Sequence, residues 1–272
     1  MHNAVIGACT QFGDYGRIKE QIIYLRGAYD TQSEVPPNFD DDATRLAYAV
    51  AYHPGHAYTY LSLLVRKTLG DAAFGGVTGS PTVLILGAGP GAETLAILRW
   101  MEAVRPELLD GARFVMVDRA EWQSTRRSVL APTVSQTWKD HGVRFHQQTA
   151  DITTAAGRDY LKREVPSADV IVCPSIVSEV ITDGMDKDLQ GWIVPYVSSG
   201  SRLVLVDHTT ERYKHVAKQW SHALSVVGEG ETGGFSLPST PAWIRENLLD
   251  RSAPKLVPKE SYKMTWSVLT PS

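Results

Sequence analysis

The chain has 272 residues, of which 43% are hydrophobic and 21% charged, and its formal net charge at pH 7 is −3. That length can bury a large core, and the composition is that of a globular protein, not a disordered or fibrous one. A mildly acidic balance provides no general attraction to nucleic acid or to anionic membranes. The two cysteines, Cys9 and Cys173, form neither a disulfide framework nor a Cys-x-x-Cys metal site, so a reducing, cytoplasmic setting is expected.

The first 80 residues predict helices. Residues 17–29 carry apolar side chains at helical spacing, and a cluster of aspartates is positioned to cap a second helix over 43–53. After a Pro-Gly pair, residues 56–70 predict another helix that ends at Gly70.

From residue 82 the pattern changes to short apolar runs that alternate with helical stretches. The runs are "TVLIL", "RFVMVD", "VRFHQQTAD", "DVIVCPS" and "SRLVLVD". Such alternation indicates βαβ units and a parallel sheet covered on both faces. "SYKMTWSVL" near the C-terminus predicts a last, antiparallel strand. The expected fold is therefore α/β, a Rossmann-like doubly wound sheet, mostly parallel, preceded by a helical N-terminal segment.

Three glycines follow the first predicted strand, in "VLILGAGPGAE". Gly87, Gly89 and Gly91 lack a Cβ, so the backbone there can adopt positive φ and approach a ligand closely. In a doubly wound sheet, ligands bind beyond the carboxyl ends of the strands, where helix N-termini present free N–H groups. The pattern fits both the dinucleotide fingerprint and the turn of S-adenosylmethionine enzymes, so it does not choose between them.

Several motifs in a fixed order narrow the choice. "VLILGAGPGAE", "FVMVDRAEW", "QQTADIT" and "ADVIVCPSIVSEV" resemble successive motifs of the class I S-adenosylmethionine-dependent methyltransferases, over residues 82–210. The resemblance implies S-adenosylmethionine as the cofactor. It also implies two units, a helical lid or substrate segment at 1–80 and a cofactor-binding methyltransferase domain at 81–272.

The resemblance assigns two acids to the cofactor. Asp118 would accept the ribose hydroxyls, and Asp151 with Ile152 would contact adenine, because an ionised carboxylate is an acceptor only. Asp118 follows Gly91 by 27 residues, whereas dinucleotide sites place their acid about 20 residues on. In the alternative, Asp118 is a solvated strand-end acid and Asp151 a helix N-cap. The expected cofactor-binding residues are Gly87, Ala88, Gly89, Gly91, Glu93, Asp118, Arg119, Asp151, Ile152 and Pro174.

One position departs from the family pattern. The family commonly has an acid two residues before the first glycine, and this chain has Ile85. Glu93 is a substitute for that acid, or simply a favourable acid in the first turn of a helix.

The acceptor side carries weaker signals. His208 and Glu179 follow predicted strands and are the expected catalytic residues, since histidine titrates near neutral pH and can take a proton. In the alternative they are a loop histidine and a helix-start acid. The expected substrate-binding residues are Tyr52, His53, His56, Tyr58 and Ser178, and core packing of amphipathic helices is the competing explanation for the first four. No metal ligands are expected.

The hypothesis is thus a methyltransferase for an O or N atom of a small molecule, in specialised metabolism. The alternative acceptor is ribosomal RNA, because residues 45–64 and 169–180 are similar to methyltransferase-like proteins of the mitochondrial small ribosomal subunit. Those proteins carry a cysteine cluster that this chain lacks. A non-catalytic scaffold and a nicotinamide oxidoreductase also remain open, and the sequence predicts no membrane helix and no oligomeric state.

Overall fold

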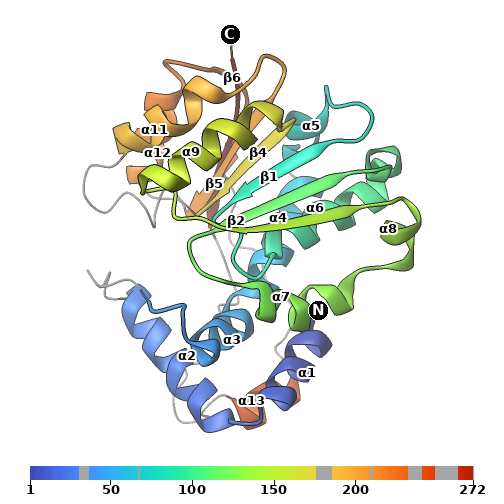
Figure 1. Ribbon diagram of the computed structural model, residues 1–272, viewed down its shortest axis with the longest axis vertical. Coiled ribbons are helices and arrows are strands. Elements are labelled where there is room, and N and C mark those ends of the chain that lie inside the picture. The colour runs from blue at the N-terminus through green and yellow to red at the C-terminus, as the bar shows by residue number, and fades with distance from the viewer. Residues whose placement is uncertain are drawn as a thin grey trace.

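A seven-stranded sheet organises the residues that the structure describes, in the order β3-β2-β1-β4-β5-β7-β6 (Figure 1). The computed structural model describes residues 1–30, 37–66, 68–175, 186–208, 211–231, 241–248 and 263–271. The strands are β1 (Thr82–Leu86), β2 (Arg113–Asp118), β3 (Arg144–Thr149), β4 (Val170–Pro174), β5 (Arg202–His208), β6 (Ser225–Glu231) and β7 (Met264–Thr270).

Strands β1 to β5 run parallel, and β7 inserts antiparallel between β5 and β6. This arrangement confirms the expected doubly wound, mostly parallel sheet with a C-terminal antiparallel strand. Strand β6 was not predicted. Its sequence, SVVGEGE, is largely exposed and poor in apolar residues, as befits an edge strand that contributes little to the core.

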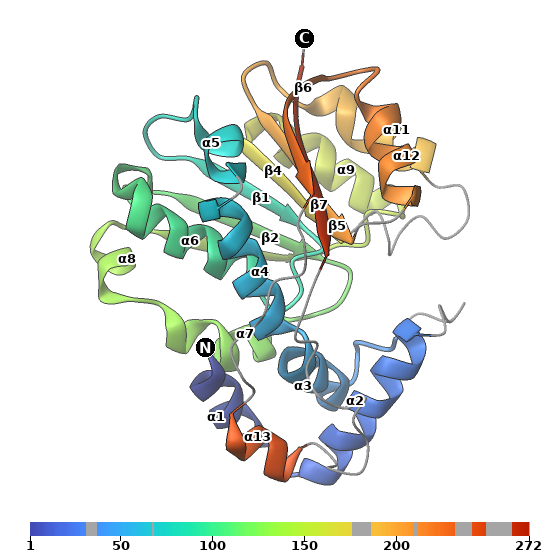
Figure 2. The ribbon, with the colours of Figure 1, turned by 180° about the vertical axis from the view of Figure 1, so that it is seen from behind.

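Helices cover both faces of the sheet and also form a separate body. They are α1 (His2–Phe12), α2 (Tyr15–Asp30), α3 (Asp42–Ala51), α4 (His53–Arg66), α5 (Leu69–Phe74), α6 (Ala92–Val104), α7 (Gln123–Val129), α8 (Gln136–Asp140), α9 (Ala155–Glu164), α11 (Asp186–Ile193), α12 (Glu211–Trp220) and α13 (Ala242–Asn247). Figure 1 shows α9, α11 and α12 in front of the sheet, and the reverse view in Figure 2 shows α4, α5 and α6 on the other face. None of the described helices has both the length and the apolar character needed to cross a bilayer.

The two faces of the sheet belong to two apolar clusters because successive side chains of a strand point to opposite sides. Val83 and Ile85 pack with α4, α5 and α6, whereas Leu84 and Leu86 pack with α9, α11 and α12. Both faces are buried, which explains the nearly continuous apolar runs in the strand sequences.

A third apolar cluster joins α1, α2 and α3 to α7 and α13 (Figure 1). Val129 of α7 and Ile244 of α13 belong to it, and we call these five helices the helical body. Helices α4 and α5 also lie within residues 1–80, yet they pack against the sheet. Of the predicted N-terminal segment, only α1 to α3 therefore stand away from the sheet core.

Two of the predictions for this segment concern the ends of helices. Asp41 caps α3 by accepting the N–H of Thr44 at 2.9 Å, which confirms the predicted aspartate cap. The prediction that Gly70 ends a helix is wrong, because α4 ends at Arg66 and Gly70 lies inside α5. A Cβ on Gly70 would lie 2.4 Å from the indole of Trp100, so the glycine permits close packing of α5 on α6.

Candidate functional site

The glycine-rich segment forms a tight turn between β1 and α6. Gly87, Gly89 and Gly91 all have positive φ, at 73°, 46° and 94°. The N–H groups of Gly87 and Ala88 donate to the carbonyl oxygen of Val117 in β2, at 2.9 and 3.1 Å. The turn thus lies at the carboxyl edge of the sheet, and its backbone requires glycine at the three positions.

Asp118, the last residue of β2, holds this turn. Its Oδ2 accepts the N–H of Gly89 at 2.8 Å, and its Oδ1 accepts the N–H of Ala120 at 3.0 Å. A carboxylate has about four lone-pair sites, so each oxygen retains the capacity to accept one more hydrogen bond. Asp118 is only half-buried, and it is oriented before any ligand binds.

A buried arginine holds the same turn from the other side. Arg126 of α7 is 3% exposed, and its Nε donates to the carbonyl oxygen of Gly89 at 2.7 Å. Its Nη1 lies 3.4 Å from Oε1 of Gln147 in β3. Burial lowers the pKa of Arg126 to about 10, while the charges of Asp118, Glu121 and Glu93 act in the opposite direction. Arg126 is not among the predicted site residues, because nothing in the segment "QSTRRSV" distinguishes it from an exposed helix residue.

The loop after β3 places Asp151 and Ile152 at the same edge of the sheet. Asp151 Oδ1 accepts the N–H and the hydroxyl of Thr153, at 2.9 and 2.6 Å. The residue that caps α9 is Thr154, which accepts the N–H of Gly157 at 3.1 Å, so Asp151 is not the N-cap. Ile152 is buried.

Ile85, the departure from the family pattern, is fully buried in the apolar cluster under α4 and α6. Glu93 in the first turn of α6 is also buried, at 4% exposure. Nearby, Tyr60 of α4 is buried, and within the described part of the chain its hydroxyl has no hydrogen-bond partner. Burial raises the pKa of Tyr60 well above its usual value, and the charges of Glu93 and Asp207 raise it further. Tyr60 is a second residue absent from the predicted site.

The carboxyl ends of β4 and β5 form the next part of the edge. Pro174 ends β4, and Ser175 follows it with φ of 51°, in the left-handed region that non-glycine residues rarely adopt. Such backbone conformations occur preferentially at functional sites. His208 ends β5 and is half-buried. Glu179 and Ser178 lie outside the described residues.

Aromatic rings from α3 and α4 lie beside the turn. A Cβ built on Gly89 would lie 3.9 Å from the ring of Tyr48, whose centroid is 5.6 Å from that of Trp122 and 5.0 Å from that of Tyr52. The rings of Tyr52 and His56 are 6.1 Å apart. We call Phe39, Tyr48, Tyr52, His56 and Trp122 the aromatic wall.

The remaining predicted residues lie in other environments. His53 is completely buried, neither of its ring nitrogens has a partner among the described residues, and burial lowers its pKa to about 3. Tyr58 is 37% exposed, and Arg119 is exposed as well. The structure thus brings Tyr52 and His56 together beside the glycine turn and sets His53 in the interior.

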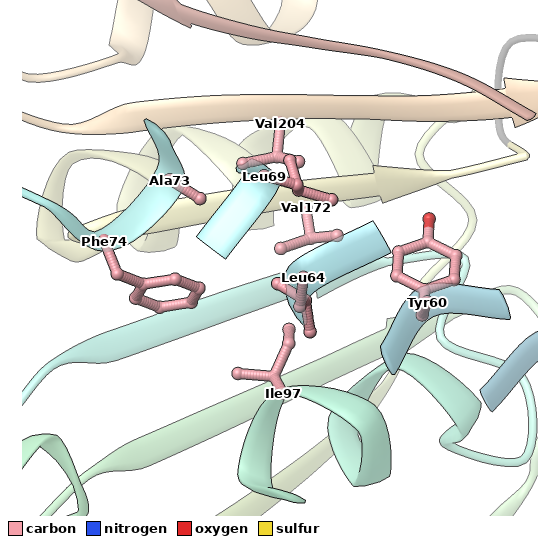
Figure 3. Close-up of a pocket in the computed structure, with 8 residues that line it drawn as sticks. All are labelled: Tyr60, Leu64, Leu69, Ala73, Phe74, Ile97, Val172 and Val204. Carbon is pink, nitrogen blue, oxygen red and sulfur yellow. The ribbon is translucent and has the colours of Figure 1, made fainter. Parts of the chain in front are cut away.

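A small cavity lies apart from this edge, between α4, α5, α6 and strands β4 and β5 (Figure 3). Its lining is apolar and includes Tyr60, Leu64, Phe74 and Val204. It is a gap in the core packing. Within the part of the chain that the structure describes, no three His, Cys, Asp or Glu side chains are grouped to hold a metal ion.

The chain matches no protein-family model and no curated protein. Solved structures resemble it at low identity. A precorrin-8w decarboxylase from Methanobacterium thermoautotrophicum is 13% identical, with a TM-score of 0.43 over 76% of this chain and 89% of its own. A candidate O-methyltransferase from Agrobacterium tumefaciens is 15% identical, with a TM-score of 0.45 over 78% and 81%. A candidate RNA methyltransferase from Pyrococcus horikoshii is 11% identical, with a TM-score of 0.47 over 93% and 98%.

The described sheet itself has the features expected from the family resemblance. Its strand order, the antiparallel β7 and the glycine turn between β1 and α6 agree with the Rossmann-like, mostly parallel sheet that the sequence predicts. Asp118 ends β2 and Asp151 follows β3 at the same edge.

Proposed function

We propose that this protein is a methyltransferase that uses S-adenosylmethionine and transfers its methyl group to an O or N atom of a small molecule. The observation that carries the proposal is the pairing of Gly89 with Asp118 at the carboxyl edge of the sheet. That contact orients a carboxylate whose two oxygens can still accept hydrogen bonds from a ribose diol.

The residues at this edge fit the cofactor in a definite order. Asp118 would hold the ribose, Asp151 and Ile152 the adenine, and the turn at Gly87 to Gly91 the part between ribose and methionine. The cofactor, when bound, supplies a methyl group on an activated sulfonium. The protein then mainly needs to align the acceptor and exclude water.

His208 is the candidate for taking a proton from the acceptor, because it ends β5 beside the end of β4. The aromatic wall would form one side of the acceptor site, with Tyr52 and His56 from the predicted set. In this proposal the lid comprises α1 to α3, since α4 and α5 belong to the sheet core. An acidic chain with an aromatic wall suits a small acceptor better than an RNA backbone.

Calorimetric titration with S-adenosylmethionine and S-adenosylhomocysteine tests the cofactor, with NADH and NADPH for comparison. We expect micromolar binding of the first two only. Binding of a nicotinamide cofactor alone would overturn the proposal, and a salt-sensitive shift of labelled RNA would replace the small acceptor with RNA.

The Asp118→Ala substitution tests the site. We expect at least about a tenfold loss of S-adenosylhomocysteine affinity, the effect of removing a charged hydrogen-bond partner. Asp169→Ala is the matched control, because Asp169 also accepts a backbone N–H, that of Thr82 at 2.7 Å, but at the amino edge of the sheet. Equal affinities for the two variants would exclude Asp118 from the cofactor site.

A further inference from the structure

Gly89 is the one residue of the turn whose peptide groups are held by side chains on both sides. Its N–H donates to Asp118 and its carbonyl oxygen accepts from Arg126, at 2.8 and 2.7 Å. The two contacts come from different elements, the end of β2 and the middle of α7. Together they fix the orientation of the backbone on either side of Gly89.

Arg126 is costly to place in this position. A buried guanidinium needs hydrogen-bond partners and opposite charges, since a buried charge is strongly disfavoured without them. Three acids, Asp118, Glu121 and Glu93, supply the opposite charge. The Nη2 atom is nevertheless buried, and no described residue accepts a hydrogen bond from it. An arginine buried under these conditions adds little to stability, which motivates the search for another role.

We propose that Arg126 is a positioning residue that presets the glycine turn for the cofactor by holding the carbonyl oxygen of Gly89 away from the ligand side. With that carbonyl held, the Gly89 N–H stays on Asp118, and Asp118 keeps its orientation toward the ribose. The identity of the ligand in this inference rests on the proposed function. The role of Arg126 in holding the turn rests on the structure alone.

The first test needs no ligand. Hydrogen exchange of the backbone amides in residues 86–92 is compared in the wild type, Arg126→Met, Arg126→Lys and Thr125→Val. We expect faster exchange in Arg126→Met and substantial recovery in Arg126→Lys, because lysine can still donate one hydrogen bond to Gly89. Thr125 is a buried neighbour on the same helix, and its variant should exchange like the wild type. Unchanged exchange in Arg126→Met would overturn the inference.

The second test separates positioning from stability. S-adenosylhomocysteine affinity should fall about tenfold or more in Arg126→Met and recover in part in Arg126→Lys, measured well below the melting temperature of each variant. A lower melting temperature with unchanged affinity would show a structural role only and would refute the inference.

Failure of the two proposals is distinguishable. A wild type that binds no S-adenosylmethionine or S-adenosylhomocysteine sinks the proposed function, while the exchange experiment still decides the role of Arg126. If Arg126→Met does not fold, Gln147→Met replaces it, since it removes an acceptor of the same guanidinium and leaves Arg126 in place; faster exchange than in the wild type is again the expected result.

Discussion

The two halves of the candidate site are held by different kinds of contact. At the glycine turn, directional hydrogen bonds of 2.7 to 2.8 Å and positive φ angles determine the position of the backbone. At the aromatic wall, rings pack at centroid distances of 5.0 to 6.4 Å, in tilted and edge-on geometries.

Because of this difference, the glycine turn admits one ligand geometry, whereas the aromatic wall admits many. Hydrogen bonds to a fixed backbone specify where each donor and acceptor of a ligand must lie. Ring packing is less directional than hydrogen bonding, and its residues can be exchanged for others of similar volume. The turn therefore constrains the position of a bound ligand closely, and the wall constrains it little.

The largest effect should come from Gly91→Ala. An alanine there would adopt a left-handed conformation, at a cost of about 1–2 kcal/mol, and its Cβ would lie 2.9 Å from Leu130. Overpacking adds about 1–3 kcal/mol. We expect both a marked loss of stability in urea denaturation and a loss of S-adenosylhomocysteine binding in calorimetry.

The Gly200→Ala substitution separates the cost of the left-handed conformation from the cost of overpacking. Gly200 has φ of +90°, close to that of Gly91, but a Cβ there would meet no atom within 4 Å. It should lose only the conformational part, about 1–2 kcal/mol, and bind the ligand normally. Equal losses for the two variants would mean that the fit against Leu130 does not constrain the turn.

A smaller effect concerns pH. His53 is buried with a pKa of about 3, lowered first by burial and then by the charges of the N-terminal amine and His2. An unfolded chain binds this proton near pH 6.5. Between pH 6.5 and 3 the unfolded state thus holds more protons, so the free energy of unfolding falls as the pH falls.

Replacing this histidine should remove that part of the pH dependence. Between pH 7 and 4.5 the wild type should lose about 2 kcal/mol more than His53→Leu in urea denaturation. Thr59→Val, a buried substitution on the same helix, changes no titratable group and should keep the wild-type slope. Parallel curves for His53→Leu and the wild type would show that His53 is not a neutral buried histidine.

The glycine turn and the acid at the strand end could be predicted from the sequence because their signals are local, and their role in cofactor binding stays a prediction. Glycines after a strand and an acid after the next strand define the turn and Asp118 without knowledge of the packing. Arg126 could not be predicted, since Arg127 beside it is the same residue type and is exposed.

Other residues show the same dependence on contacts between distant segments. The sequence predicts that Gly70 ends a helix. The structure places Gly70 within α5, where the indole of Trp100 leaves no room for a Cβ. Tyr60 is one of several tyrosines in the amphipathic helices of this segment. Its burial depends on the packing of α4 against the sheet. The roles of Glu179 and Ser178 stay predictions.

The smallest expected effect tests whether the helical body contributes to the cofactor half at all. Asp41 accepts the N–H and the hydroxyl of Thr44, at 2.9 and 3.0 Å, and also pairs with Arg17. Asp41→Ala should cost about 1 kcal/mol, as the loss of an N-cap does, with unchanged S-adenosylhomocysteine affinity. Asp41→Asn retains a capping oxygen and should stay near wild-type stability, which separates the cap from the ion pair. A parallel fall of affinity and stability in Asp41→Ala would mean that α3 also sets the geometry of the turn, through Tyr48 against Gly89, and that the two halves are not independent.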